Sequence, residues 1–214
     1  MANEYELRCA VKQAGVDMLK ENLVQGTWGN ISIRLDENRM LVTPSGLDYI
    51  TLTPEDMAIV DINTLEWTGP KKPTSERKIH AAILRDRPEI NVVLHSHPTQ
   101  CSIFASTRKS LPVMNDRMAK YIGGEARCAK YGLPGTKKIT ANTLEALKDR
   151  NGCFLANHGV FACGATVEDA FEAIRVLEEG CREYIVKTVL EKTGAKEFSD
   201  ELLYSLFIKT IRTK

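Results

Sequence analysis

Three of the four histidines in this chain stand at positions suited to holding a metal ion. His95 and His97 form a His-x-His step at the end of the apolar run 90–94. Because side chains at i and i+2 of a strand point to the same face, these two imidazoles can chelate one ion if the run is a strand. His158 would be the third ligand. Three protein ligands and one open position are the arrangement of a catalytic metal site.

The same histidines also have a structural interpretation. Histidines at strand ends cap loops or bond backbone carbonyls, so the His-x-His step alone leaves both roles open. Gly159 favours the metal, because a glycine permits positive φ and so a sharp turn that aims His158 outward. His80 lies on an otherwise apolar stretch of a predicted helix and is expected to be packed, or to support a ligand, rather than to bind a metal.

A carboxylate and three small polar loops complete the candidate chemistry. Glu76 starts a predicted helix, where a glutamate is usually a helix-dipole partner or solvated, but beside a metal it can transfer protons. The loops supply short side-chain donors and backbone amides, which bind phosphate without a large basic side chain, although each loop taken alone is better explained as a simple turn. No nucleotide-binding loop is present, so we expect neither a nucleoside triphosphate nor a nicotinamide cofactor. The loop residues are Gly29, Asn30, Ser45, Gly46, Thr74 and Ser75.

Composition excludes several classes of function. With 214 residues the chain is expected to be a single domain spanning 1–214. A net charge of +1 gives no reason to expect a nucleic acid partner. No apolar run is long enough to cross a bilayer, and the chain starts without an apolar signal segment, so we expect no membrane partner. The six cysteines form no Cys-x-x-Cys pair, which predicts reduced thiols and a cytoplasmic protein.

Hydrophobic periodicity predicts a mixture of helices and hairpins. The fold class expected is α/β, a single-domain α/β/α sandwich in which a largely antiparallel sheet has helices on both faces. Thr74, Thr140 and Thr166 are the expected helix caps. Helices are predicted over 4–23, 75–85, 111–124, 140–150, 166–191 and 198–214, with another after Pro98. Strands are predicted over 31–35, 40–43, 58–62, 65–68, 92–97, 126–129, 153–156 and 160–163.

Taken in order, five segments resemble the motifs of the class II aldolase/adducin family. The segments are 26–32, 43–46, 74–76, 95–98 and 157–159. Each is weak alone, but five in order at family-like spacing are specific, and the resemblance covers nearly the whole chain. Within the family they resemble the L-fuculose-1-phosphate and 5-deoxyribulose-1-phosphate aldolases. The resemblance implies an α/β sandwich and a homotetramer with active sites between neighbouring subunits.

The resemblance also implies roles for individual residues. His95, His97 and His158 match the metal ligands, and Glu76 matches the catalytic acid/base. The three small loops match the phosphate-binding positions. The implied reaction cleaves a deoxyketose 1-phosphate, of the 5-deoxyribulose or fuculose type, to dihydroxyacetone phosphate and a short aldehyde through a metal-stabilised enediolate. One divalent ion per subunit is expected; zinc suits three histidines, and manganese or cobalt is compatible.

The aldehyde end of the substrate departs from the family pattern. Members carry a tyrosine ahead of their Gly-Gly pair, supplied from a neighbouring subunit. Counting back from Gly123 and Gly124 places Arg117 at that position, with Tyr121 closer to the glycines. Arg117 and Tyr121 are therefore the aldehyde-side candidates. The aldehyde itself, which is lactaldehyde, acetaldehyde or a thioether aldehyde depending on the sugar, stays open.

Two kinds of alternative stay open at this point. A ribulose-phosphate 4-epimerase or a methylthioribulose-1-phosphate dehydratase would share the same metal site, although an epimerase is expected to have aspartate at position 76. A non-catalytic adducin-like binding module needs none of the metal ligands. The presence of all three histidines and Glu76 argues against that module.

Overall fold

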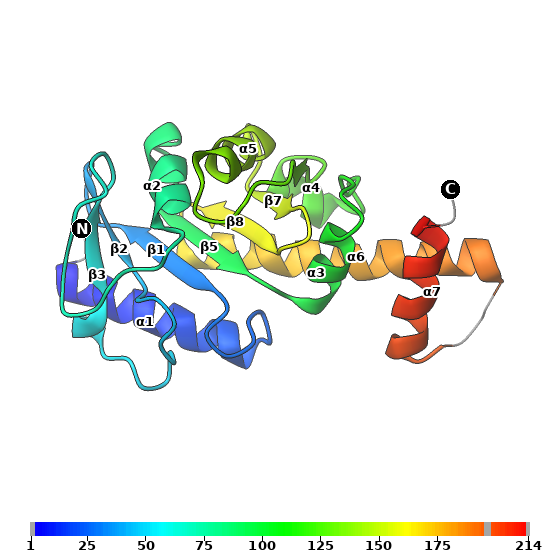
Figure 1. The fold of residues 1–214 in the computed structure, drawn as a ribbon, viewed down its shortest axis with the longest axis horizontal. Helices are drawn as coiled ribbons and strands as arrows, with labels where there is room; N and C mark the ends of the chain where they lie inside the picture. Colours follow the sequence, from blue (N-terminus) through cyan, green and yellow to red (C-terminus); the bar gives the residue numbers. More distant parts are fainter. Residues whose placement is uncertain (1–2, 195–197, 213–214) are drawn as a thin grey trace.

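The computed structural model describes residues 3–194 and 198–212, and the strands of these residues form one sheet (Figure 1). Its strand order is β4-β3-β2-β1-β5-β8-β7-β6, and every neighbouring pair is antiparallel except the parallel pair β6 and β7. The predicted α/β class with a largely antiparallel sheet is therefore confirmed. The strands are β1 (Asn30–Arg34), β2 (Arg39–Val42), β3 (Ala58–Asp61), β4 (Trp67–Thr68), β5 (Val92–Ser96), β6 (Cys128–Ala129), β7 (Gly152–Leu155) and β8 (Val160–Gly164).

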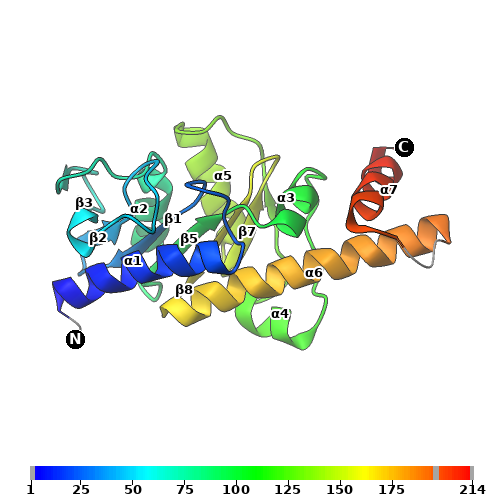
Figure 2. The same cartoon turned by 90° about the horizontal axis from the view of Figure 1, so that it is seen from below.

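Helices cover both faces of this sheet, as predicted (Figures 1 and 2). One face packs against α1 and α6, and the other against α2 and α5, so the sheet separates two clusters of buried apolar side chains. None of the helices in the described residues combines the length and apolar character needed to span a bilayer. The helices are α1 (Glu4–Lys20), η1 (Pro54–Asp56), α2 (Arg77–Asp86), α3 (Thr99–Ala105), α4 (Asp116–Ile122), α5 (Lys137–Leu147), α6 (Val167–Thr193) and α7 (Asp200–Arg212).

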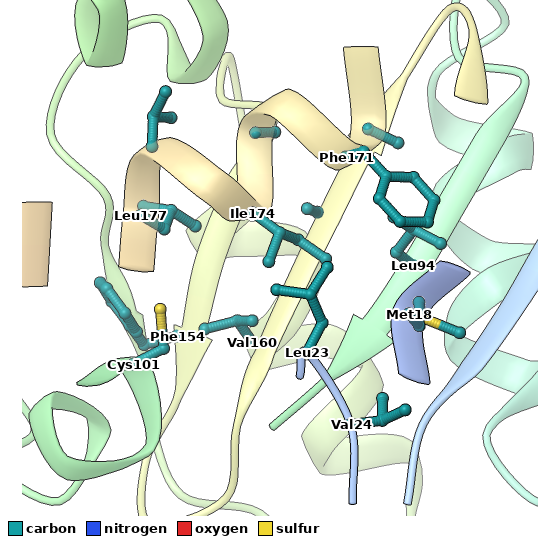
Figure 3. Close-up of a cluster of buried hydrophobic side chains, with 14 of the residues drawn as sticks. Met18, Leu23, Val24, Leu94, Cys101, Phe154, Val160, Phe171, Ile174 and Leu177 are labelled. Atoms are coloured by element: carbon teal, nitrogen blue, oxygen red, sulfur yellow. The ribbon is translucent and has the colours of Figure 1, made fainter. Parts of the chain in front are cut away.

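The central strands are fixed by burial on both faces. Leu94 of β5 and Val160 of β8 pack beneath Phe171 and Ile174 of α6 (Figure 3). All four side chains are at most 3% exposed. Each such side chain contributes about 1.5–3 kcal/mol when it is fully buried. This packing against α6 therefore holds β5 and β8 in place, and with them the strand ends where the histidines lie.

Two of the predicted helices begin three or more residues away from the predicted start. Residues 111–115 are not helical, because Leu111 forms a β-bridge with Ala126, and α4 starts only after its cap Asn115. The predicted cap Thr140 lies inside α5. The actual cap is Thr136, whose side chain accepts a hydrogen bond from the Ile139 amide. The other predicted helices are confirmed with shifted bounds, and residues 213–214 of the predicted last helix lie outside the described residues.

Candidate active site

The three histidines singled out in the sequence converge. His95 lies in β5, His97 follows the end of that strand, and His158 lies in the turn between β7 and β8. Their ligand atoms all lie within 4.8 Å of one another, and the Nε2 atoms of His95 and His97 are 2.8 Å apart. Two nitrogens bound tetrahedrally to zinc lie roughly 3.3 Å apart, so the spacing suits a shared ion. Among the described residues this is the cluster able to hold a metal.

His95 is oriented by its neighbours in the sheet. Its Nδ1 lies 2.9 Å from the carbonyl oxygen of Val160. A carbonyl only accepts, so Nδ1 carries the proton and Nε2 presents its lone pair to the other histidines. The ring also stacks on Phe161, its cross-strand neighbour, with centroids 4.7 Å apart. Both the tautomer and the ring plane are therefore fixed by the protein.

The turn that carries His158 differs from the prediction in one respect. Positive φ occurs at Asn157 (+58°), and Gly159 does not adopt it. Gly159 is required for another reason: a Cβ there would lie 2.5 Å from the Ser96 carbonyl oxygen and 3.3 Å from the His97 ring. The glycine thus lets the His158 turn approach the His95–His97 segment closely, which brings the third imidazole to the other two.

Burial keeps the imidazoles of His95 and His97 neutral. It lowers the pKa of His95 to about 3 and, together with the neighbouring histidines, lowers the pKa of His97 to about 4. Neutral imidazole is the form that binds a metal. The Nδ1 atom of His158 is buried and has no hydrogen-bond partner among the described residues. Neutral nitrogen donors and an unpartnered buried nitrogen are what a site for a divalent ion such as zinc requires, so these residues fit one.

Glu76 lies beside this cluster. It is the N-cap residue of α2, and its Oε2 is 3.3 Å from Nε2 of His95. Since His95 is neutral at pH 7, this contact is no ion pair; it places a carboxylate oxygen next to a ligand nitrogen. The Asn30 amide donates to the same Oε2 at 2.8 Å. Thr74, the predicted cap of the helix, instead accepts from the Glu76 amide at 3.3 Å and so orients the turn that carries the carboxylate.

The three polar loops are brought together by backbone pairing. Pro44 and Pro73 form a β-bridge, and the amides of Ser45 and Thr74 donate to the carbonyls of Lys72 and Thr43. The loops open onto one cavity of about 490 Å³ together with Glu76 and the histidines. A larger hollow of about 870 Å³ lies at the opposite ends of β1 and β5, and no histidine of the described residues lines it. The chemistry therefore belongs to the smaller cavity.

The predicted phosphate residues divide into two groups. Ser45, Gly46 and Ser75 are exposed at the cavity, whereas Asn30 and Thr74 are 6% and 4% exposed. Both buried side chains are bonded around Glu76, which the sequence did not indicate. Gly29 also lines the cavity, and no lysine or arginine of the described residues does. An anion bound here would be held by neutral donors.

Arg117 and Tyr121 do not reach this cavity from their own chain. Both lie on α4, and neither lines it. The Arg117 guanidinium is paired with Glu172 and Glu179 of α6, at 2.7 and 2.6 Å. Their aldehyde-side role, which the resemblance places across a subunit interface, stays a prediction.

Tyr49 is a supporting residue that sequence reasoning missed. Its hydroxyl donates to the carbonyl of Gly29, and its buried ring fills the space left by the missing side chain of Gly15. Burial raises the pKa of the Tyr49 hydroxyl, so it stays protonated and remains a donor. No local pattern distinguishes this tyrosine from any other loop tyrosine.

Comparison with known proteins identifies the family to which the chain belongs. Residues 9–185 match the model of the class II aldolase and adducin N-terminal domain. The chain belongs to the class II aldolase and adducin family. A 5-methylthioribulose-1-phosphate/5-deoxyribulose-1-phosphate aldolase of Rhodospirillum rubrum is 33% identical over 181 residues, 83% of this chain and 81% of that protein. A 5-deoxy-D-ribulose 1-phosphate aldolase of Bacillus thuringiensis is 34% identical over 165 residues, 77% of each chain.

Solved structures of this family share the fold. An L-fuculose 1-phosphate aldolase superimposes with a TM-score of 0.81 at 27% identity and covers 96% of each chain. The protein is accordingly an enzyme of the class II aldolase kind. Class II aldolases are metal-dependent, and the three-histidine cluster of this chain can hold a metal.

Proposed function

We propose that this enzyme cleaves a deoxyketose 1-phosphate, of the 5-deoxyribulose or fuculose type, to dihydroxyacetone phosphate and a short aldehyde. One observation carries the proposal: a Glu76 carboxylate oxygen lies 3.3 Å from Nε2 of His95 inside the cavity that the three histidines share with the neutral polar loops. A proton-transfer group, a metal cluster and anion donors are the parts that such a cleavage needs. The relatives that act as aldolases on such sugar phosphates support it.

His95, His97 and His158 would hold one divalent ion per subunit, which we propose is zinc, with manganese or cobalt also compatible. The ion would supply Lewis acidity toward the substrate oxygens, and three neutral ligands leave it its full positive charge. The chain fixes how the ligand nitrogens are presented. The Val160 carbonyl sets the tautomer of His95, and Gly159 lets the His158 turn come close to the His95–His97 segment.

The bond changes assign a role to Glu76. In the cleavage the C4 hydroxyl loses its proton, the C3–C4 bond breaks, the aldehyde leaves, and C3 gains a proton to give dihydroxyacetone phosphate. We propose that Glu76 moves the proton at C3, with one carboxylate oxygen held by the Asn30 amide. Ser45, Gly46 and Ser75, with the neighbouring residues Gly29, Asn30 and Thr74, would hold the 1-phosphate and so fix the distance of C3 from Glu76.

The C4 end is proposed to involve a neighbouring subunit. Arg117 and Tyr121 of a partner copy are the candidates for contact with the departing aldehyde. We propose that residues 1–214 form one domain and that the enzyme is a cytoplasmic homotetramer. The end of α6 together with α7 extends beyond the sheet, with Leu190 and Leu202 exposed, which supports an interface there (Figure 1).

A substrate panel tests the proposal. The purified protein, stripped of metal and then reloaded with zinc or manganese, is incubated with 5-deoxyribulose 1-phosphate, its methylthio analogue and fuculose 1-phosphate. We expect release of dihydroxyacetone phosphate from at least one sugar, dependent on metal, while the Glu76→Gln variant serves as the blank. Loss of water or epimerisation without triose phosphate release would replace the aldolase by the dehydratase or epimerase.

A further inference from the structure

Three buried polar side chains form a hydrogen-bonded ladder behind Glu76. Asn30 and Ser32 are two residues apart on β1, so they share a face, and His80 of α2 follows the N-cap Glu76 by one helical turn. Nε2 of His80 lies 2.5 Å from Oδ1 of Asn30, and Nδ1 of His80 lies 2.8 Å from the Ser32 hydroxyl. The Asn30 amide then donates to Glu76 at 2.8 Å. The two-residue spacing of Asn30 and Ser32 along the strand thus matches the four-residue spacing of Glu76 and His80 along the helix.

The direction of every bond in this ladder follows from the carboxylate. The Glu76 oxygen accepts, so Asn30 must turn its NH₂ group toward Glu76 and its carbonyl oxygen toward His80. That oxygen can only accept, so Nε2 of His80 carries a proton. In neutral imidazole Nδ1 then has the lone pair, and the Ser32 hydroxyl donates to it. Burial lowers the pKa of His80 to about 3, in keeping with a neutral ring.

The ladder is not explained by stability. His80 and Ser32 are fully buried, and His80 packs edge-on against Phe161 among apolar residues of α2. Buried polar groups cost free energy unless all are bonded, and apolar residues of similar shape are often as stable or more stable. What the ladder provides is orientation: without a donor at His80, the Asn30 oxygen loses the partner that anchors it, and the Asn30 side chain is free to rotate away from Glu76.

We propose that His80 is a positioning residue that locks the Asn30 amide so that Glu76 is held toward His95. The inference rests on the proposed function, because Glu76 is the group whose placement matters. Ser32 acts indirectly: its hydroxyl donates to Nδ1 of His80 and so fixes the His80 tautomer. Neither His80 nor Ser32 lines the cavity, so both act through Asn30.

Two amide variants give a matched test. His80→Gln places an amide NH₂ near the position of Nε2, where it can still donate to Asn30. His80→Asn reaches only as far as Nδ1, so it keeps a partner for Ser32 and loses the bond to Asn30. We expect His80→Asn to lower kcat by roughly 10–100-fold with KM little changed, and His80→Gln to retain kcat within about threefold of the wild type.

Three controls separate positioning from a structural role. Metal content and thermal stability should be alike in the two variants, because both bury one amide. Adding His80→Asn to Glu76→Gln should produce no further loss of kcat, since the ladder acts through the Glu76 carboxylate. Equal kcat in His80→Asn and His80→Gln would overturn the inference. So would the same fall in kcat when His80→Asn is added to Glu76→Gln as when it is added to the wild type.

Crystal structures of the metal-free variants decide the matter independently of activity. In His80→Asn we expect the Asn30 side chain to rotate away and the Glu76 carboxylate to leave its position beside His95, whereas His80→Gln should keep both in place. An unmoved carboxylate in His80→Asn refutes the positioning role whatever the reaction is. Absence of aldol cleavage in the wild type, with the carboxylate displaced as expected, would instead refute only the proposed function.

Discussion

Replacing Gly159 by alanine should damage the metal site through a backbone clash. The added Cβ would lie 2.5 Å from the Ser96 carbonyl oxygen, and Cβ atoms essentially never come closer than 3.0 Å to such a neighbour. The strand end or the His158 turn must therefore move by at least 0.5 Å, the difference between the two distances. Metal–ligand distances tolerate only about 0.2 Å, so one imidazole leaves its ligand position.

The expected size of the effect follows from this displacement. Overpacking of this kind costs about 1–3 kcal/mol in the free energy of unfolding, and for a protein of this length each kcal/mol lowers the melting temperature by about 2–4 °C. Zinc affinity should fall by roughly tenfold or more, as it does when the surroundings of a ligand are disturbed. Thermal melting of the metal-free protein and zinc titration against a competing chelator measure the two effects separately.

Gly164→Ala is the matched control. Its Cβ would lie 2.6 Å from Cβ of Asp169 and 2.7 Å from the Ala170 amide nitrogen, a similar clash at the opposite end of β8. Its loss of stability should be similar, with zinc affinity unchanged. Wild-type zinc affinity in Gly159→Ala, or an equal loss of affinity in both variants, would refute the reasoning.

The remaining predictions concern the histidines and the carboxylate. Glu76→Gln should keep the metal and lower kcat by about 10²–10⁴-fold; steady-state kinetics with metal analysis checks this, and retained turnover would remove Glu76 from the mechanism. His97→Ala should lower the zinc content of the purified protein, and unchanged content would show that the ligand set is wrong. Burial lowers the pKa of His95 to about 3 and that of His97 to about 4, below the unfolded value of about 6.5, so the unfolded chain binds more protons in between. The metal-free protein should therefore lose stability as the pH falls below about 6.5, by up to about 1.4 kcal/mol per pH unit for each histidine, and a flat profile in denaturant titrations between pH 6.5 and 4.5 would contradict this.

The sequence predicted those parts of the site that depend on local geometry. The step from His95 to His97 spans two residues, and a strand places such residues on one face wherever it lies in the fold. Placing Glu76 beside them needed the family resemblance, because a glutamate at the start of a helix looks alike whether it is solvated or catalytic. The structure explains its position by the packing of α2 over β1 and β5, where Asn30 pairs directly with His95.

What could not be predicted depends on contacts between distant segments. The helix predicted from residue 111 does not start there, because Leu111 pairs with Ala126 in a β-bridge. Gly159 was correctly marked as special, but its reason is the nearby Ser96 carbonyl rather than its own φ. The link from His80 through Asn30 to Glu76 joins a strand and a helix some fifty residues apart, and no local pattern reveals such a contact.

Proton exchange into dihydroxyacetone phosphate tests the central claim most directly, because it needs no knowledge of the aldehyde. The metal-loaded enzyme is incubated with dihydroxyacetone phosphate in D₂O, and deuterium at the hydroxymethyl carbon is followed by NMR. The account predicts exchange of one of the two hydrogens in the wild type, abolished by metal removal and by Glu76→Gln. No exchange in the metal-loaded wild type, or undiminished exchange in Glu76→Gln, would contradict it.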